Sequence, residues 1–131
     1  MDTLKINTVE PLTSRGQGYV QMEMDCGPAI YRGQIKVRGN STAMGYKKPY
    51  AVKLETKAHL LGSGDKKYIL LANCFDPTMM RNFLALSMAK ELNIPYTPTC
   101  KYARALTVLA LLSLLVAYRK DILRRMRLLR R

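Results

Sequence analysis

Alternation of apolar and polar residues in several short segments is the feature that most restricts how this chain folds. The segments precede residue 76, and the clearest of them is 18–24, in which Val20, Met22 and Met24 would share one face of a strand. Stretches containing Gly, Pro and Ser separate them. We therefore predict strands at 3–8, 18–24, 33–39, 49–55 and 66–73.

The spacing of the apolar residues changes at Asp76. The segment 76–93, DPTMMRNFLALSMAKELN, offers Asp76 as an N-cap and Pro77 at the first helical position, and Pro95 follows its end. One face of this helix would carry Met80, Phe83, Leu84, Met88 and Leu92. The chain up to residue 102 thus predicts an α+β fold, an antiparallel β-sheet with one main helix.

Residues 103–131 differ in composition from the domain at 1–102. They hold 9 Leu and 7 Arg and no Gly, Pro or Asn. The run from Ala105 to Tyr118 is 14 residues without a charge, which is shorter than the roughly 20 that a membrane span needs. We predict a Leu/Arg-rich helical tail that either packs on the domain or lies on a membrane surface as a basic helix.

The net charge of +13 is unevenly distributed. Residues 103–131 have a net charge of +7, and the 10 Lys and 4 Arg of residues 1–102 exceed 8 acidic residues to give +6. A positive excess of this size is typical of proteins whose partner is nucleic acid, an anionic membrane or a phosphorylated ligand. We expect no nucleic-acid partner, and a membrane surface only in the alternative given below.

Three cysteines, Cys26, Cys74 and Cys100, lie far apart, and His59 is the one histidine. This set predicts no zinc site and no closed disulfide framework, so we interpret the cysteines as buried thiols. The first ten residues lack a basic region followed by an apolar run, which predicts no signal peptide in this chain and leaves its location open.

A polar loop separates the predicted strands at 33–39 and 49–55. The stretch IKVRGNSTAMGYKKPYAVKL, at 35–54, places Gly39 and Gly45 in this loop and Lys53 on the strand after it. In the simplest interpretation the lysine is a solvated charge and the loop an ordinary turn. Alternatively, the loop approaches a phosphate and the lysine neutralises it.

The stretch at 35–54 and the residues that follow it resemble the spore coat protein H family, also called the CotH kinase family. The resemblance covers about residues 3–102 and rests on several motifs in order. They are Arg38–Thr42, Lys47, Lys48, Tyr50, Lys53, Leu61, Gly62, Leu70–Asn73, Asp76, Thr78, Met80, Arg81 and Asn82.

The resemblance implies the amino-terminal, mostly β lobe of an atypical protein kinase. The family uses ATP and a divalent metal such as Mg²⁺ to phosphorylate serines of proteins, spore coat proteins among them, and includes spore-associated and secreted or surface proteins. Lys53 takes the place of the strand lysine that neutralises nucleotide phosphates. The expected cofactor-binding residues are Arg38, Gly39, Asn40, Ser41, Lys48 and Lys53.

The roles of two residues at the start of the helix remain open. Arg81 and Asn82 would support the loop, contact the nucleotide or cap the helix. The helix glutamate that pairs with the strand lysine in the usual protein kinases has no clear counterpart, since Glu91 lies near the end of the helix.

The family's catalytic and metal-binding acidic residues lie downstream of the matched region, so we expect no catalytic residue and no metal ligand in this chain. The resemblance ends near Tyr102. We hypothesise that a shift of reading frame produced residues 103–131. If residues 106–108 are written as the codons TTG ACG GTN, a shift of one base gives Asp-Gly, the dipeptide that the family would show there.

Two functions follow as hypotheses. The first is a truncated CotH-like protein kinase fragment, inactive alone, whose family transfers phosphate from ATP to a protein substrate. The alternative is a non-enzymatic binding or membrane-associated module that uses the basic carboxy-terminal helix.

Overall fold

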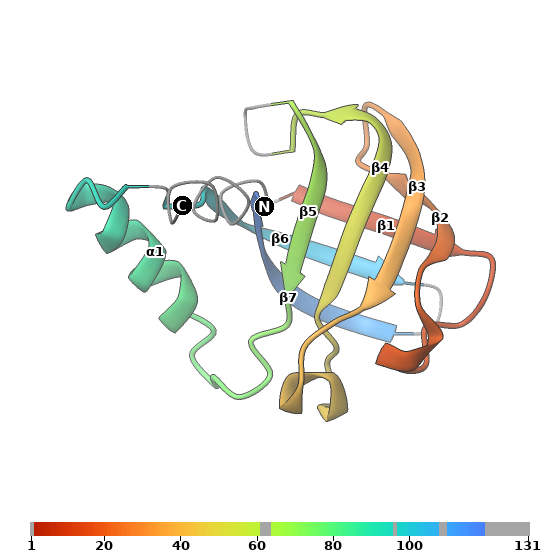
Figure 1. Ribbon diagram of the computed structural model, residues 1–131, viewed down its shortest axis with the longest axis horizontal. Coiled ribbons are helices and arrows are strands. Elements are labelled where there is room, and N and C mark those ends of the chain that lie inside the picture. The colour runs from red at the N-terminus through yellow and green to blue at the C-terminus, as the bar shows by residue number, and fades with distance from the viewer. Residues whose placement is uncertain (1, 61–63, 96, 108–109, 120–131) are drawn as a thin grey trace, which may run out of the picture.

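The structure, a computed structural model, describes residues 2–60, 64–95, 97–107 and 110–119, with only the backbone described at 2, 107 and 110–119 (Figure 1). Leu61 and Gly62 of the family motif therefore lie outside the described residues. In chain order the elements are β1 (Asp2–Thr8), η1 (Arg15–Gln17), β2 (Val20–Asp25), β3 (Ile30–Val37), η2 (Ser41–Met44), β4 (Tyr50–Ala58), β5 (Asp65–Leu71), α1 (Arg81–Glu91), β6 (Cys100–Thr107) and β7 (Ala110–Arg119).

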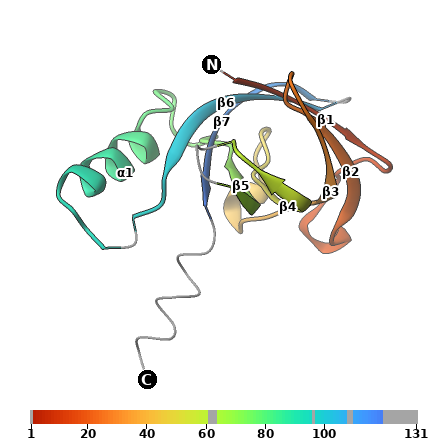
Figure 2. The same ribbon diagram turned by 90° about the horizontal axis from the view of Figure 1, so that it is seen from above.

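The strands close into a barrel in the order β1-β2-β3-β4-β5-β7-β6. Neighbouring strands are antiparallel except β1 and β6, which pair in parallel, so the sheet is mixed rather than wholly antiparallel. The helix α1 lies outside the barrel on the side of β6 and β7 (Figures 1 and 2). The α+β prediction is confirmed.

Alternate residues of the predicted strands fill the interior of the barrel. Val20, Met22 and Met24 are buried as expected, and Ile35 and Val37 of β3 are at most 1% exposed. The hydroxyl of Tyr68 donates a hydrogen bond to the carbonyl of Ala58 from within the core. The core cluster is completed by Leu4, Ile6, Tyr50, Val52, Leu54, Leu70, Ala72, Ala103 and Ala105.

The predicted helical tail is wrong over residues 103–107 and 110–119, which form most of β6 and all of β7. The remaining tail residues, 108–109 and 120–131, lie outside the described part of the chain. A short apolar run suits a buried strand as well as a helix, and its length alone does not separate the two. Pairing decided the outcome here, because β6 and β7 occupy the edges of β1 and β5 that would otherwise be open.

The helix begins at Arg81, five residues after the predicted N-cap Asp76. Residues 76–79 form a turn instead, in which the main chain of Met79 has a positive φ of 56°. The predicted apolar face is also divided. Phe83 packs on Tyr102 of β6 with ring centroids 4.8 Å apart, whereas Met80, Leu84, Met88 and Leu92 are 47–70% exposed.

Among the described residues, no helix is both long and apolar enough to cross a membrane. All three cysteines are half-buried, and no disulfide joins them. The expectation of buried thiols is therefore met only in part.

We predict that Gly33→Ala destabilises the barrel. A Cβ at this position of β3 would stand 2.3 Å from the carbonyl oxygen of Lys53 and 2.8 Å from Cα of Leu54, both backbone atoms of β4. The strands must then separate locally, at a cost of about 1–3 kcal/mol. Urea unfolding measures the loss. Gly16→Ala is the control, since its nearest neighbour is the Ser14 Oγ at 3.9 Å; equal stability of the two variants would contradict the prediction.

Candidate functional site

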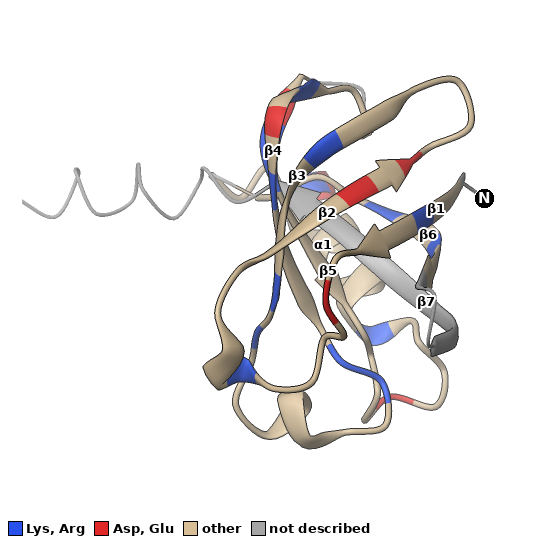
Figure 3. Cartoon of the chain, turned by 90° about the vertical axis from the view of Figure 1, so that its right-hand side faces the viewer, with Lys and Arg blue, Asp and Glu red and all other residues tan. Residues whose placement is uncertain are grey.

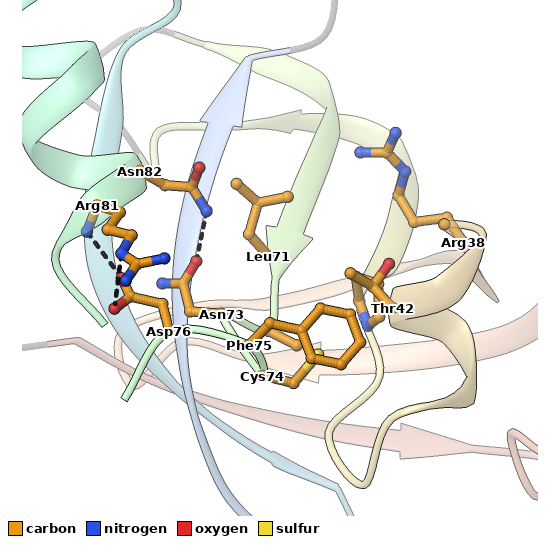
Figure 4. A pocket seen from close by; sticks show the side chains of 12 residues that line it. Arg38, Thr42, Leu71, Asn73, Cys74, Phe75, Asp76, Arg81 and Asn82 are labelled. Carbon is orange, nitrogen blue, oxygen red and sulfur yellow. Dashed lines mark hydrogen bonds and ion pairs between the residues drawn. The ribbon is translucent and has the colours of Figure 1, made fainter. Parts of the chain in front are cut away.

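A pocket of about 440 Å³ opens at the end of the barrel where the β3–β4 loop meets the segment between β5 and α1 (Figure 4). The β3–β4 loop contributes Arg38, Gly39, Thr42 and Pro49 to its lining. The opposite wall comes from residues 71–76 together with Arg81 and Asn82. Figure 4 shows Arg38 on one side and Arg81 with Asp76 on the other, with Leu71 and Phe75 between them.

Internal hydrogen bonds hold the β3–β4 loop in shape. The main-chain N–H of Arg38 donates to the carbonyl of Pro49 at 3.0 Å, which closes the base of the loop. The Lys48 ammonium donates to the carbonyl of Ala43 at 2.8 Å. From outside the loop, one guanidinium nitrogen of Arg15 donates to the Gly39 carbonyl at 3.1 Å and to the side-chain oxygen of Asn40.

Gly39 is required where the loop turns. Its φ is +94°, a conformation that other residues rarely adopt, and a Cβ there would lie 2.2 Å from Oγ1 of Thr42. The loop also touches the opposite wall. A Cβ at Gly45 would stand 3.0 Å from the Cys74 Sγ, so the two walls are already in close contact at that point.

Asp76 organises the other wall. Its Oδ1 accepts hydrogen bonds from the Thr78 hydroxyl at 2.6 Å and the Thr78 N–H at 3.1 Å, and its Oδ2 accepts the Arg81 N–H at 2.8 Å. Asp76 therefore satisfies an N–H of the first turn of α1 from outside the helix, as an N-cap would. The Thr78 hydrogen bond is the main cause of a lowered Asp76 pKa, and the N–H groups and the charge of Arg81 act in the same direction.

Two further hydrogen bonds brace this wall. The Asn82 amide donates to the side-chain oxygen of Asn73 at 2.6 Å, and the Tyr102 hydroxyl donates to the Met79 carbonyl at 2.7 Å. Met79 and Asn73 both have positive φ values, 56° and 49°, so the segment turns sharply at each end. These contacts fix the wall to β6 as well as to α1.

The structure separates the predicted cofactor-binding residues. Arg38 and Gly39 line the pocket, whereas the Asn40 and Lys48 side chains bond within or beside the loop, and exposed Ser41 begins η2. Lys53 lies farther away.

Lys53 is exposed on β4, in register between Gln34 and Lys67. Strand geometry places it about 13 Å along the chain from Pro49 but on the same face of the sheet. Among the residues that the structure describes, the basic positions recur along several strands and do not form one block (Figure 3). Lys53 therefore lies on the face that continues from the pocket, outside the pocket lining itself.

Sequence reasoning left Asn73, Phe75 and Asp76 without a binding role and left Arg81 and Asn82 undecided. The order and direction of the strands could have identified these residues as part of the site. Because successive antiparallel strands reverse direction, the β3–β4 loop and the end of β5 must lie at the same end of the sheet. The residues after β5 are thus the natural second wall of any site built on that loop.

The pocket suits an anion better than a metal ion. Arg38 and Arg81 lie across it, and the carboxylate of Asp76 already accepts three hydrogen bonds. Within the described ranges, no group of three or more His, Cys, Asp or Glu side chains is placed to hold a metal ion. The lining thus presents two guanidinium groups and one carboxylate that is already hydrogen-bonded.

We predict that the stability lost in Asp76→Asn depends on pH. Because the folded-state pKa of Asp76 lies below 3.8, the carboxylate stabilises the fold above that pH, and this contribution disappears as the pH falls through the lowered value. Urea unfolding of both proteins should therefore show a gap at pH 7 and pH 5 that closes in more acidic solution. A gap that is constant down to pH 2 would contradict the assignment.

The sequence was also compared with the models of known protein families. Residues 35–108 match the model of the family described as CotH kinase protein. The match covers more than half of the 131 residues and contains the β3–β4 loop, β4, β5, α1 and β6, and thus both walls of the pocket. No curated protein matches the chain. The resemblance found from the motifs is confirmed, and the chain belongs to the CotH kinase family.

Proposed function

We propose that this chain supplies the phosphate-binding part of a CotH-type protein kinase and that its pocket receives the phosphate groups of ATP. The observation that carries the proposal is the pairing of Arg38 and Gly39, from the β3–β4 loop, with Arg81 and Asn82, from the start of α1, around one pocket. Its volume of about 440 Å³ is within the range of small-molecule sites.

The residues around the pocket have distinct roles in this proposal. The Arg38 guanidinium offers a planar fork of donors that matches phosphate oxygens. Gly39 lets the loop main chain approach the ligand, because it has no side chain and a φ that other residues avoid. Leu71 and Phe75 form an apolar surface between the arginines for the remainder of the nucleotide.

The remaining predicted residues act less directly. Asn40 and Lys48 hold the loop in shape through the hydrogen bonds described above, and Ser41 begins the short helix within it. Lys53 adds positive charge on the face that leads to the pocket. Its effect should weaken with salt, since an exposed lysine acts over about one Debye length.

ATP would supply the phosphoryl group, and the acceptor would be a serine of a protein substrate, as the resemblance to coat protein kinases implies. At the pocket the Asp76 carboxylate is engaged in capping α1, and among the described residues no group of three or more His, Cys, Asp or Glu side chains is placed to hold a metal ion. We therefore assign binding and orientation of phosphate to this chain and no catalytic step.

No observation favours the alternative of a membrane-associated module. It required a basic helix at 103–131, and the described part of that segment is β-strand. Residues 120–131 lie outside the described chain.

We predict that Arg38→Ala weakens binding of ATP by about tenfold, the usual effect of losing a charge-assisted hydrogen bond pair. Lys53→Ala should weaken it by less, and the difference should shrink at high salt. Isothermal titration calorimetry of the full chain, with ATP and with tripolyphosphate, measures both.

Lys57→Ala is the matched control, because Lys57 is an exposed lysine on the same strand, farther from the pocket. If the unmodified chain binds neither ligand, or if Lys57→Ala weakens binding as much as Arg38→Ala, the proposed site is wrong.

A further inference from the structure

We infer that Arg81 is a phosphate ligand of the pocket and that Asp76 is the positioning residue that holds it there. The inference rests on the proposed function and extends it to two residues whose sequence context left helix capping, loop support and ligand contact equally open. Capping is done by Asp76, as the hydrogen bond from the Arg81 N–H to its Oδ2 shows. The side chain of Arg81 is therefore left for another role.

The Arg81 side chain has the geometry of a ligand-binding group. It lines the pocket, and 77% of its surface is exposed. Its Nε lies 3.7 Å from Oδ1 of Asp76, and across the described residues the guanidinium makes no other side-chain hydrogen bond or ion pair. The two terminal nitrogens, which form the fork that binds phosphate or carboxylate oxygens, are thus available.

Asp76 restrains Arg81 at two points. One carboxylate oxygen accepts the Arg81 main-chain N–H, and the other lies 3.7 Å from its Nε, so the main chain and the Nε of Arg81 both lie against a carboxylate that is itself only 8% exposed. Thr78 fixes the orientation of that carboxylate with two hydrogen bonds. A guanidinium that is already held in place loses less conformational entropy on ligand binding than an unrestrained one.

Stability alone does not account for the ion pair. An ion pair with so exposed an arginine adds little to stability, and the capping of α1 uses only the main chain of residue 81. The position of the Arg81 side chain in the pocket lining indicates a role in ligand binding instead. With Arg38 on the other side of the pocket and Asp76 as the carboxylate that lines it, the lining carries one net positive charge next to the start of α1, where N–H groups favour anions.

The experiment is a double-mutant cycle on tripolyphosphate affinity, measured by calorimetry on the full chain. Arg81→Ala should weaken binding by about tenfold, and Asp76→Asn, which keeps the size of the side chain, by about threefold. If Asp76 acts through Arg81, then Asp76→Asn causes no further loss in the Arg81→Ala background. Circular dichroism confirms that each variant is folded, and Asp76→Ser replaces Asp76→Asn if that variant is not.

Lys90→Ala is the matched control, since it removes a cation from the other end of α1 and should leave the affinity unchanged. Arg81→Lys, which keeps the charge but not the fork, should recover only part of the affinity.

Two results overturn the inference alone: Arg81→Ala binding as tightly as the unmodified chain while Arg38→Ala binds weakly, or losses from Asp76 and Arg81 that simply add. If the unmodified chain does not bind tripolyphosphate at all, the proposed function fails and this inference fails with it.

Discussion

Closure of the sheet is the constraint on which the rest of the structure depends. In a closed sheet each strand is paired on both sides, and the parallel pairing of β1 with β6 removes the last open edge. Once the barrel is closed, the ends at which its loops emerge are fixed. Because β3, β4 and β5 are antiparallel neighbours, the β3–β4 loop and the segment after β5 emerge at the same end, although they share no regular hydrogen-bonded structure.

Different interactions shape the two walls of the pocket. The loop wall is shaped by glycine conformation and main-chain closure, which bring the backbone close to the pocket. The helix wall is shaped by one buried carboxylate that orders a turn, a helix start and an arginine together. An apparently simple motif, DPTMMRN, thus encodes both the late start of α1 and the orientation of the groups at its first turn.

Much of the fold could be predicted from the sequence, because period-two alternation reports directly on which side chains enter the core. Val20, Met22, Ile35 and Val37 are buried as that pattern requires. The strands β6 and β7 could not be predicted in this way. Their apolar run is compatible with a helix, and only long-range pairing with β1 and β5 selects the strand.

Only part of the candidate site could be predicted, because a local motif does not show which distant residues the fold brings beside it. Arg38 and Gly39 belong to the loop that the motif identifies, and they line the pocket. Lys53 is close to them in sequence but lies outside the lining, because an extended strand moves it away by about 3.3 Å for each residue. Arg81 is distant in sequence yet lies at the pocket, since the segment after β5 emerges at the same end of the sheet as the β3–β4 loop.

The contact between Gly45 and Cys74 has a thermodynamic consequence. These two walls are separated by about thirty residues of chain and meet only when β4 and β5 are paired between them. A ligand that touches both walls cannot bind to either one alone. Such a ligand binds the folded barrel and not the unfolded chain, so it raises the free energy of unfolding of the whole barrel once its concentration exceeds its Kd.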